Sequence, residues 1–195
     1  NDVADSVGNK RIGKLIGSTN ETTWSKTLDR SSFYFNGVDN VVDTGLQLKD
    51  LKVPFAFTFW VNPAATQVEY ADIFGNHDGS FGLVMQQDSK KNNSFGFGYG
   101  DGQQGYGPGL VQLVAGEWQH VVVVCDGEKA VCYVNGIEKC SSVAKGVFVD
   151  NSKMNFKLGQ GYNENRFFHG FLSDVRIYPR ALSSKEIMKM VMENK

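Results

Sequence analysis

At 195 residues the chain fits one large domain, because all-β sandwiches and barrels reach this size without splitting. Its net charge of -1 argues against nucleic acid or an anionic membrane surface as a partner. The sequence has no uninterrupted apolar run of about 18 residues, so we expect no membrane insertion. With 41% hydrophobic residues, 22 glycines and only 4 prolines, we expect a sizeable core whose strands are joined by many tight turns.

The first 28 residues have little hydrophobic periodicity and are interrupted by glycines. We expect residues 1–28 to form a loop that wraps over a sheet edge and is held there by Trp24. Residues 32–36 then alternate like a strand, and residues 55–61 form a second, stronger one. Phe55, Phe57, Phe59 and Val61 share one face of that second strand, which Pro63 ends.

Shorter strands are predicted at residues 72–74, 81–86 and 94–98, separated by turn residues. Residues 98–109 contain a dense run of glycines, which costs much conformational entropy to order. We therefore interpret this segment as either a mobile loop or a loop that faces a ligand.

The most strand-like stretch lies at residues 116–137. Its four consecutive valines, Val121 to Val124, are apolar without alternation, which predicts a central strand covered on both faces. Asp126-Gly127 and Asn135-Gly136 are turn signals, so two hairpins in a row are expected.

The chain has 3 cysteines, so at least one is unpaired within the monomer. The predicted hairpins make Cys125 and Cys132 diagonal neighbours about 7 Å apart, too far for easy bridging. They put Cys140 opposite Val131, on the other side of the sheet from Cys132. We expect three free, mostly buried thiols.

The end of the chain departs from the strand pattern. After expected strands at residues 155–158 and 170–178, residues 183–186 form a capping box, and Leu182 can pack on Ile187. A short helix over residues 184–192 is predicted to dock on the sandwich.

Five motifs in order carry a family resemblance: Phe35-Asn-Gly37, Phe57-Thr-Phe-Trp-Val61, Trp118-Gln-His-Val-Val-Val-Val124, Tyr133-Val-Asn-Gly136 and Gly170-Phe-Leu-Ser-Asp-Val-Arg-Ile-Tyr178. Together they resemble concanavalin A-like, laminin-G-type and pentraxin-like jelly rolls over about residues 3–187. The resemblance implies an all-β, two-sheet antiparallel jelly-roll sandwich with a short C-terminal helix, formed by residues 1–195 as a single domain.

No catalytic motif accompanies this resemblance. Hydrolases of this fold carry two carboxyl groups on one strand face, as retaining hydrolysis requires. Glu69 and Asp72 have the wrong spacing for that arrangement. There is also no Gly-x-Ser-x-Gly elbow, Cys/His metal cluster or phosphate loop. We expect no enzymatic activity, and we assign His120, Trp60 and Trp118 to the core.

The resemblance also implies a structural Ca²⁺ that joins an early turn to the last strand. Asp174 would supply its carboxylate, and Asn36, Gly37 and Asp39 would supply the turn. Calcium prefers such mixed carbonyl and carboxylate oxygens. In the alternative interpretation, Asp174 pairs with Arg176 or caps a strand end.

Three loops combine the aromatic, amide, acidic and basic groups that hold sugars. The candidate ligand-binding residues are His77 and Asp78, then Tyr99, Asp101 and Tyr106, and last Tyr162, Asn163 and Arg166. The leading hypothesis is a non-catalytic, lectin-like carbohydrate-binding module that belongs to a larger secreted or cell-surface protein and binds a glycan or glycoprotein. The alternatives are a protein-binding adhesion or scaffold domain of laminin-G type, and an ancillary domain of a glycoside hydrolase.

Overall fold

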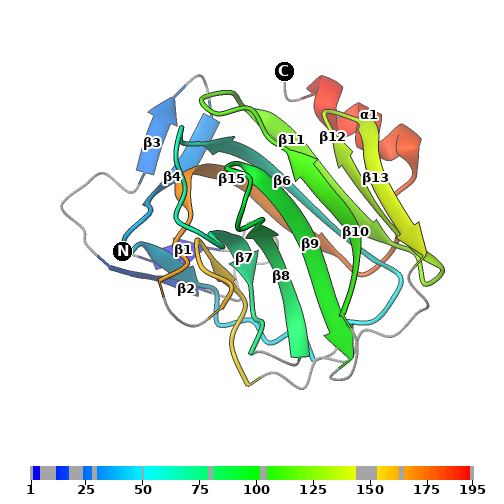
Figure 1. Cartoon of the computed structure of the whole chain (residues 1–195), viewed down its shortest axis with the longest axis horizontal. Helices are drawn as coiled ribbons and strands as arrows, with labels where there is room; N and C mark the ends of the chain where they lie inside the picture. The colour runs from blue at the N-terminus through cyan, green and yellow to red at the C-terminus, as the bar shows by residue number, and fades with distance from the viewer. Residues whose placement is uncertain are drawn as a thin grey trace.

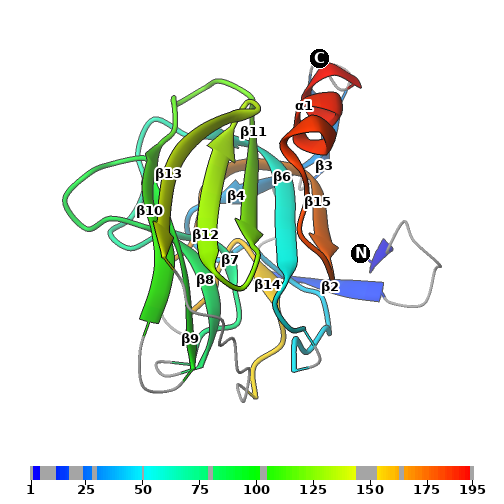
Figure 2. The same cartoon turned by 90° about the vertical axis from the view of Figure 1, so that its right-hand side faces the viewer.

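The structure is a computed structural model that describes residues 2–4, 12–17, 24–27, 30–49, 51–78, 81–101, 105–143, 153–162 and 165–193. Over these residues the chain forms two antiparallel sheets packed face to face, with one short helix (Figures 1 and 2). This arrangement confirms the predicted all-β sandwich.

Each sheet draws its strands from distant parts of the chain. The eight-stranded sheet has the order β1 (Asp2–Ala4), β2 (Ile12–Ile16), β5 (Val41–Asp43), β14 (Lys157–Leu158), β7 (Asp72–Gly75), β8 (Phe81–Gln87), β9 (Ser94–Asp101) and β10 (Gly105–Gln112). The seven-stranded sheet has the order β13 (Ile137–Val143), β12 (Lys129–Val134), β11 (Gln119–Cys125), β6 (Phe55–Pro63), β15 (His169–Tyr178), β4 (Arg30–Asn36) and β3 (Trp24–Thr27).

The beginning of the chain departs from the prediction. Within residues 1–28, where a loop was expected, β1 and β2 extend one end of the eight-stranded sheet, and β3 extends one end of the seven-stranded sheet. Backbone hydrogen bonds to an open sheet edge form without apolar alternation, which explains why these strands were not predicted. The side chain of Trp24 lies outside the described residues.

The core lies between the sheets and is largely aromatic. Phe55, Phe57 and Phe59 of β6 all point into it, as their alternation predicted. Phe57 stacks on Phe74 of the opposite sheet, with ring centroids 5.4 Å apart and planes inclined by 14°. Such aromatic pairs stabilise a core beyond the area they bury.

The valine run of β11 is covered on both faces, as expected. Val121 and Val123 enter the core between the sheets. Val122 and Val124 face the other way and pack under the C-terminal helix, α1 (Ser184–Glu193), with Ile187. The predicted capping box closes the start of α1, because Ser183 N donates to Glu186 Oε2 over 2.8 Å. Figure 1 shows α1 beside β11 and β12.

The glycine-rich segment forms strands rather than one long loop. β9 and β10 pair as a hairpin that includes most of residues 98–109. Phe95, Phe97 and Tyr99 point into the core, so the intervening Gly96 and Gly98 lie on the outer face. Buried aromatics on one face offset the entropy lost by the glycines on the other.

Within the second hairpin, one predicted cysteine position is wrong. Cys125 faces Ala130 as expected, and the described cysteines are free, with Cys140 only partly buried. A register shift beyond Tyr133, however, places Cys140 directly opposite Cys132 instead of Val131. A β-bulge inserts one extra residue, so every later side chain changes its partner and face.

This register makes a disulfide between Cys132 and Cys140 geometrically possible. Directly opposite residues have Cα atoms about 4.5 to 5.5 Å apart, within the range that disulfides span. Incubation with oxidised glutathione is expected to form this bond by thiol–disulfide exchange, with two glutathione thiols released. Peptide mass spectrometry should find the cross-link; a Cys125 cross-link instead would contradict the register.

Candidate functional site

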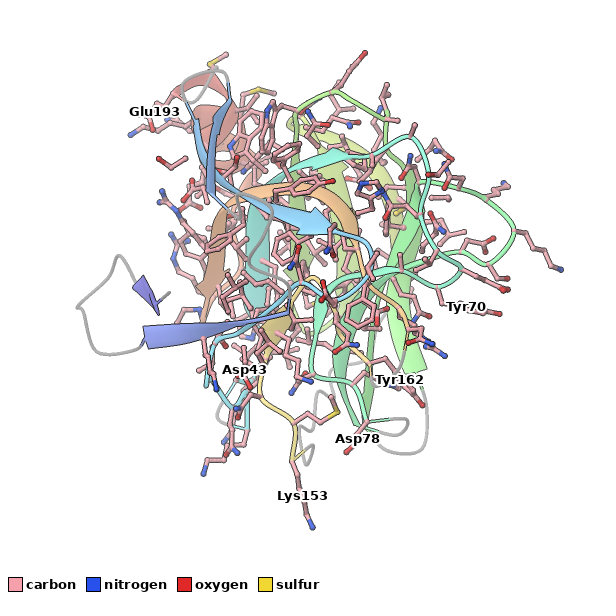
Figure 3. The ribbon with its side chains drawn as sticks, turned by 90° about the vertical axis from the view of Figure 1, so that its left-hand side faces the viewer. Asp43, Tyr70, Asp78, Lys153, Tyr162 and Glu193 are labelled. Carbon is pink, nitrogen blue, oxygen red and sulfur yellow. The ribbon has the colours of Figure 1, made fainter. Side chains whose placement is uncertain are left out.

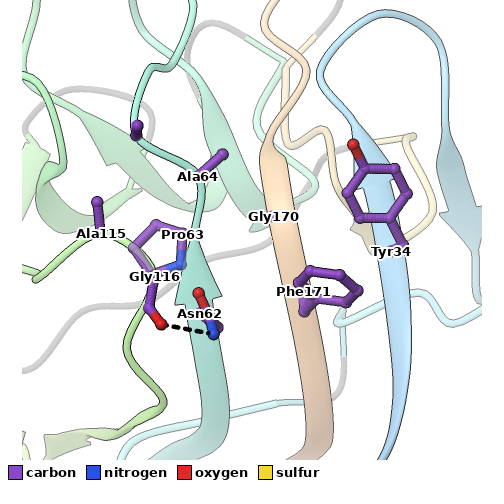
Figure 4. Close-up of a pocket in the computed structure, with 9 residues that line it drawn as sticks. Tyr34, Asn62, Pro63, Ala64, Ala115, Gly116, Gly170 and Phe171 are labelled. Carbon is purple, nitrogen blue, oxygen red and sulfur yellow. Dashed lines mark hydrogen bonds between the residues drawn. The ribbon is translucent and has the colours of Figure 1, made fainter. Parts of the chain in front are cut away.

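A groove lies on the outer face of the seven-stranded sheet (Figure 4). Tyr34, Phe171 and Asn62 are register partners on three adjacent strands, so their side chains form one outward row. The helix α1 covers the far end of this face over Ala56 and Val122. The row is thus left open at the end that the helix does not reach.

Half-buried aromatic rings form the groove's apolar surface. Tyr34 and Phe171 have ring centroids 4.9 Å apart, and Trp118 lies 6.3 Å from Phe171 on its other side. The assignment of Trp118 to the core was wrong, because its side chain is only half-buried and packs near Phe171 on the outer face of the sheet. Trp60 and His120 are buried as predicted.

Small residues and backbone groups shape the rest of the groove, which encloses about 360 Å³. Asn62 Nδ2 donates to the carbonyl oxygen of Gly116 over 3.2 Å. The hydroxyl of Tyr34 lies 3.1 Å from Nε2 of His169. Gly170 allows β15 and β6 to approach, since a Cβ there would lie 2.4 Å from the carbonyl oxygen of Asn62. The groove therefore combines flat aromatic surface with fixed hydrogen-bonding groups.

A second cluster lies on the loops that join β6 to β7, β7 to β8 and β14 to β15. The guanidinium carbon of Arg166 is 4.2 Å from the ring centroid of Tyr162 and 5.2 Å from that of Tyr70. His77 stacks on Tyr162 with ring centroids 5.4 Å apart. Figure 3 shows Tyr70 and Tyr162 on one flank, with Asp78 near them. We call Tyr70, Arg166, Tyr162 and His77 the arginine stack.

Asp72 is hydrogen-bonded to the segment that carries Tyr162 of the arginine stack. Its fully buried carboxyl group accepts hydrogen bonds from Gln86 Nε2 and from the backbone N–H groups of Gly161 and Tyr162, over 2.9, 3.1 and 2.9 Å. Burial raises the pKa of Asp72 to about 6, although these hydrogen bonds and the charge of Arg166 act in the opposite direction. Asp72 thus positions the segment that carries Tyr162, rather than meeting a ligand itself.

The structure brings together three of the candidate ligand residues, His77, Tyr162 and Arg166. Burial lowers the pKa of His77, while the charge of Asp78 raises it and that of Arg166 lowers it. The interpretation of Tyr99 as a ligand residue was wrong, because its ring is buried in the aromatic core. The side chains of Asp101, Tyr106 and Asn163 lie outside the described part of the chain.

The four residues expected to bind calcium do not lie together. Asn36 pairs with His169, whereas Asp174 lies five residues further along β15, roughly 15 Å away. Asp174 Oδ1 accepts from Arg176 Nε over 2.6 Å, as the alternative interpretation anticipated.

The turn at Asn36, Gly37 and Asp39 is closed by its own hydrogen bonds, since Asn36 Nδ2 donates to Asp39 Oδ1 over 2.8 Å. Among the described residues, no three His, Cys, Asp or Glu side chains converge as metal ligands. The expected donor set therefore does not fit one Ca²⁺.

The groove residues Tyr34 and Phe171 were not among the sequence candidates. Alternation does contain a signal for Tyr34, because Phe33 and Phe35 point inward and leave it outward. The outward position of Phe171 follows from the inward position of Leu172. What alternation could not reveal is that α1 leaves this part of the face uncovered.

Comparisons with known proteins agree with the fold. The chain is similar to domain 4 of AbnA, a GH43 extracellular arabinanase from Geobacillus stearothermophilus, solved with arabinotriose, with 23% identity and a TM-score of 0.76. That match covers 97% of this chain and 93% of the other. The chain is also similar to the botulinum neurotoxin type G receptor binding domain, with 14% identity and a TM-score of 0.69, over 95% of this chain and 47% of that one.

A third similar structure is the binding domain of botulinum neurotoxin DC in complex with SialylT, with 14% identity and a TM-score of 0.62. That match covers 100% of this chain and 45% of the toxin domain. This chain therefore spans about half the length of the toxin domains. A search of curated proteins gave no match.

The described residues form a two-sheet jelly roll, and two of these three similar structures are binding domains by name. The sequence pattern of the concanavalin A-like lectin/glucanases superfamily matches residues 36–188. The chain belongs to this family. No helix in the described part of the chain is long and apolar enough to cross a bilayer.

Proposed function

We propose that this chain is a non-catalytic carbohydrate-binding module that takes a glycan in the groove beside Tyr34 and Phe171. The observation that carries the proposal is the pair of half-buried rings, 4.9 Å apart, on a sheet face that α1 leaves open. Aromatic faces pack on the apolar C–H faces of sugars, and the polar groups at the rim match sugar hydroxyls. At about 360 Å³ the groove has the size of a small-ligand site.

The similar structures support a role in binding rather than catalysis. One is a domain of an extracellular arabinanase solved with arabinotriose, and another is a toxin binding domain solved with SialylT. We place the chain, by the same analogy, within a larger secreted or cell-surface protein, where it would hold a glycan or glycoprotein. An ancillary role beside a catalytic domain fits the same picture.

We expect a glycan array to find ligands for the chain and Phe171→Ala to weaken them at least tenfold, because a lost stacking ring exposes sugar surface to water. Arabinotriose is the first oligosaccharide to titrate by calorimetry. Tyr178→Ala is the matched control, since Tyr178 is an aromatic residue of the same strand packed near α1.

Silence across the array would contradict the proposal and favour the protein-binding alternative. Equal losses in Phe171→Ala and Tyr178→Ala would contradict the location of the ligand in the groove, while leaving glycan binding itself intact.

A further inference from the structure

In the arginine stack, the guanidinium carbon of Arg166 lies over the rings of Tyr162 and Tyr70, 4.2 and 5.2 Å from their centroids. His77 stacks on Tyr162 and extends the column. Because a guanidinium group donates hydrogen bonds in its own plane, aromatic rings packed over it leave the N–H edge as its polar surface. The stack thus presents a fixed, flat row of donors.

No carboxylate neutralises this row within the described part of the chain. The three ion pairs found there involve Arg176, Arg180 and Lys189, not Arg166. Asp72 feels the charge of Arg166, but its carboxyl oxygens already accept from Gln86 and from two backbone N–H groups. Asp78 acts on His77, which is at the other end of the column.

The backbone around the stack is held before any ligand arrives. Asp72 N donates to the carbonyl oxygen of Arg166 over 2.8 Å, and Phe167 forms a parallel bridge to Asp72. Tyr162 N donates to the Asp72 carboxyl group over 2.9 Å. A site that is ordered in advance loses less conformational entropy on binding.

We propose that Arg166 is a subsite for the carboxylate of an acidic sugar residue. A planar guanidinium fork matches a carboxylate through two parallel hydrogen bonds, and such charge-assisted pairs are stronger than neutral ones. Tyr70, with 39% of its surface exposed, supplies the aromatic flank that a sugar ring packs against. The choice of a sugar as the carrier of the carboxylate rests on the proposed carbohydrate-binding function.

This subsite is separate from the groove, although residues 64–72 and 166–170 connect the two sites. Ala64 N donates to the carbonyl oxygen of His169 near the groove, and Asp72 N donates to that of Arg166 near the stack. Arg166 and Gly170 are four residues apart, which spans roughly 13 Å in extended chain. Substitutions in one site therefore leave the other in place.

The test uses the whole chain and two probes that differ at one carboxyl group, which is charged in one and methylated in the other. One is a disaccharide that ends in glucuronic acid, and the other is its methyl ester. Calorimetry is expected to give at least tenfold tighter binding of the acid, and this preference should decline as salt rises. Sodium acetate as a competitor separates recognition of a bare carboxylate from recognition of the acidic sugar, which should bind tighter.

Arg166→Gln is expected to remove the preference for the acid. Arg166→Lys should remove most of it too, because an ammonium group is a point charge without the flat fork. Arg176→Gln is the matched control, since it deletes the same charge from an exposed arginine that pairs with Asp174.

Equal affinity of the unsubstituted chain for acid and ester would overturn the proposal without any variant. Full retention of the preference for the acid in Arg166→Lys would also overturn the proposal. An equal loss of that preference in Arg176→Gln would overturn it too. If Phe171→Ala weakens neutral glycans while the acid and ester bind alike, only the arginine subsite fails. If Phe171→Ala has no effect but the preference for acid holds, only the groove assignment fails.

Discussion

Replacement of Gly159 by alanine is expected to lower the free energy of unfolding by about 2 to 5 kcal/mol. Gly159 has φ +84, and a Cβ there would lie 2.2 Å from Cδ1 of Phe35. The left-handed backbone costs a non-glycine residue about 1 to 2 kcal/mol, and overpacking a core costs about 1 to 3 kcal/mol. Urea unfolding followed by tryptophan fluorescence measures the sum.

Gly45→Ala is the matched control for this experiment. Gly45 has φ +65, but nothing lies within 4 Å of a Cβ there, so only the backbone cost of about 1 to 2 kcal/mol applies. Similar losses in the two variants would mean that the contact with Phe35 is relieved by a small shift. A larger loss of unfolding free energy in Gly159→Ala than in Gly45→Ala would show that position 159 requires glycine for packing as well as for its backbone φ.

Gly159 also connects the core to the arginine stack. Its N–H donates to the carbonyl oxygen of Ile73, and its own carbonyl oxygen accepts from Phe168 N. The chain between Gly159 and Phe168 carries Tyr162 and Arg166. Gly159→Ala is therefore expected to weaken binding of acidic sugars as well as stability.

The fold was predictable where one face of a strand is buried. The alternation of Phe55, Phe57 and Phe59 and the unbroken valines of β11 both report burial directly, and both predictions are confirmed. Where strands are held by backbone pairing at a sheet edge, as in β1 and β3, side chains carry little information. The bulge that pairs Cys132 with Cys140 is a backbone event without a sequence signal here.

The sites were less predictable, because both depend on what other elements leave uncovered. Composition identified Tyr162 and Arg166 as candidates, but not that Tyr70, nearly a hundred positions earlier, completes their stack. Tyr99 had the same composition signal and is buried. Loop composition therefore reports residue chemistry, whereas exposure and convergence follow only from the packing of the two sheets.

Asp72 is expected to make the chain less stable at neutral pH than at pH 4, by about 2 to 3 kcal/mol relative to Asp72→Asn. The reason is burial, which raises the folded-state pKa of Asp72 from its usual 3.8 to about 6. The folded chain then binds the proton more tightly than the unfolded chain. This contribution is complete below pH 3.8 and is lost as the pH rises through about 6, at about 1.36 kcal/mol per pKa unit.

Urea unfolding of the unsubstituted chain and Asp72→Asn at pH 4 and at pH 7.5 measures this difference. Asparagine is neutral at both pH values and can keep the contacts with Gln86 and the 161–162 backbone if the Gln86 amide turns over. Asp126→Asn is a control in which stability should change with pH in the opposite direction. Burial acts to raise the pKa of Asp126, but the N–H groups of Lys129 and Glu128 lower it overall, so its contribution is lost as the pH falls.

A stability difference between chain and variant that does not change with pH would mean that Asp72 is ionised even at pH 4. In that case the hydrogen bonds from Gln86, Gly161 and Tyr162 would outweigh the cost of burial, and the segment below the arginine stack would be held by a buried charge. The expected pH dependence instead requires burial to dominate. Protonation of Asp72 in acid would then stabilise the segment that carries Tyr162 and Arg166, without altering the charge of the arginine itself.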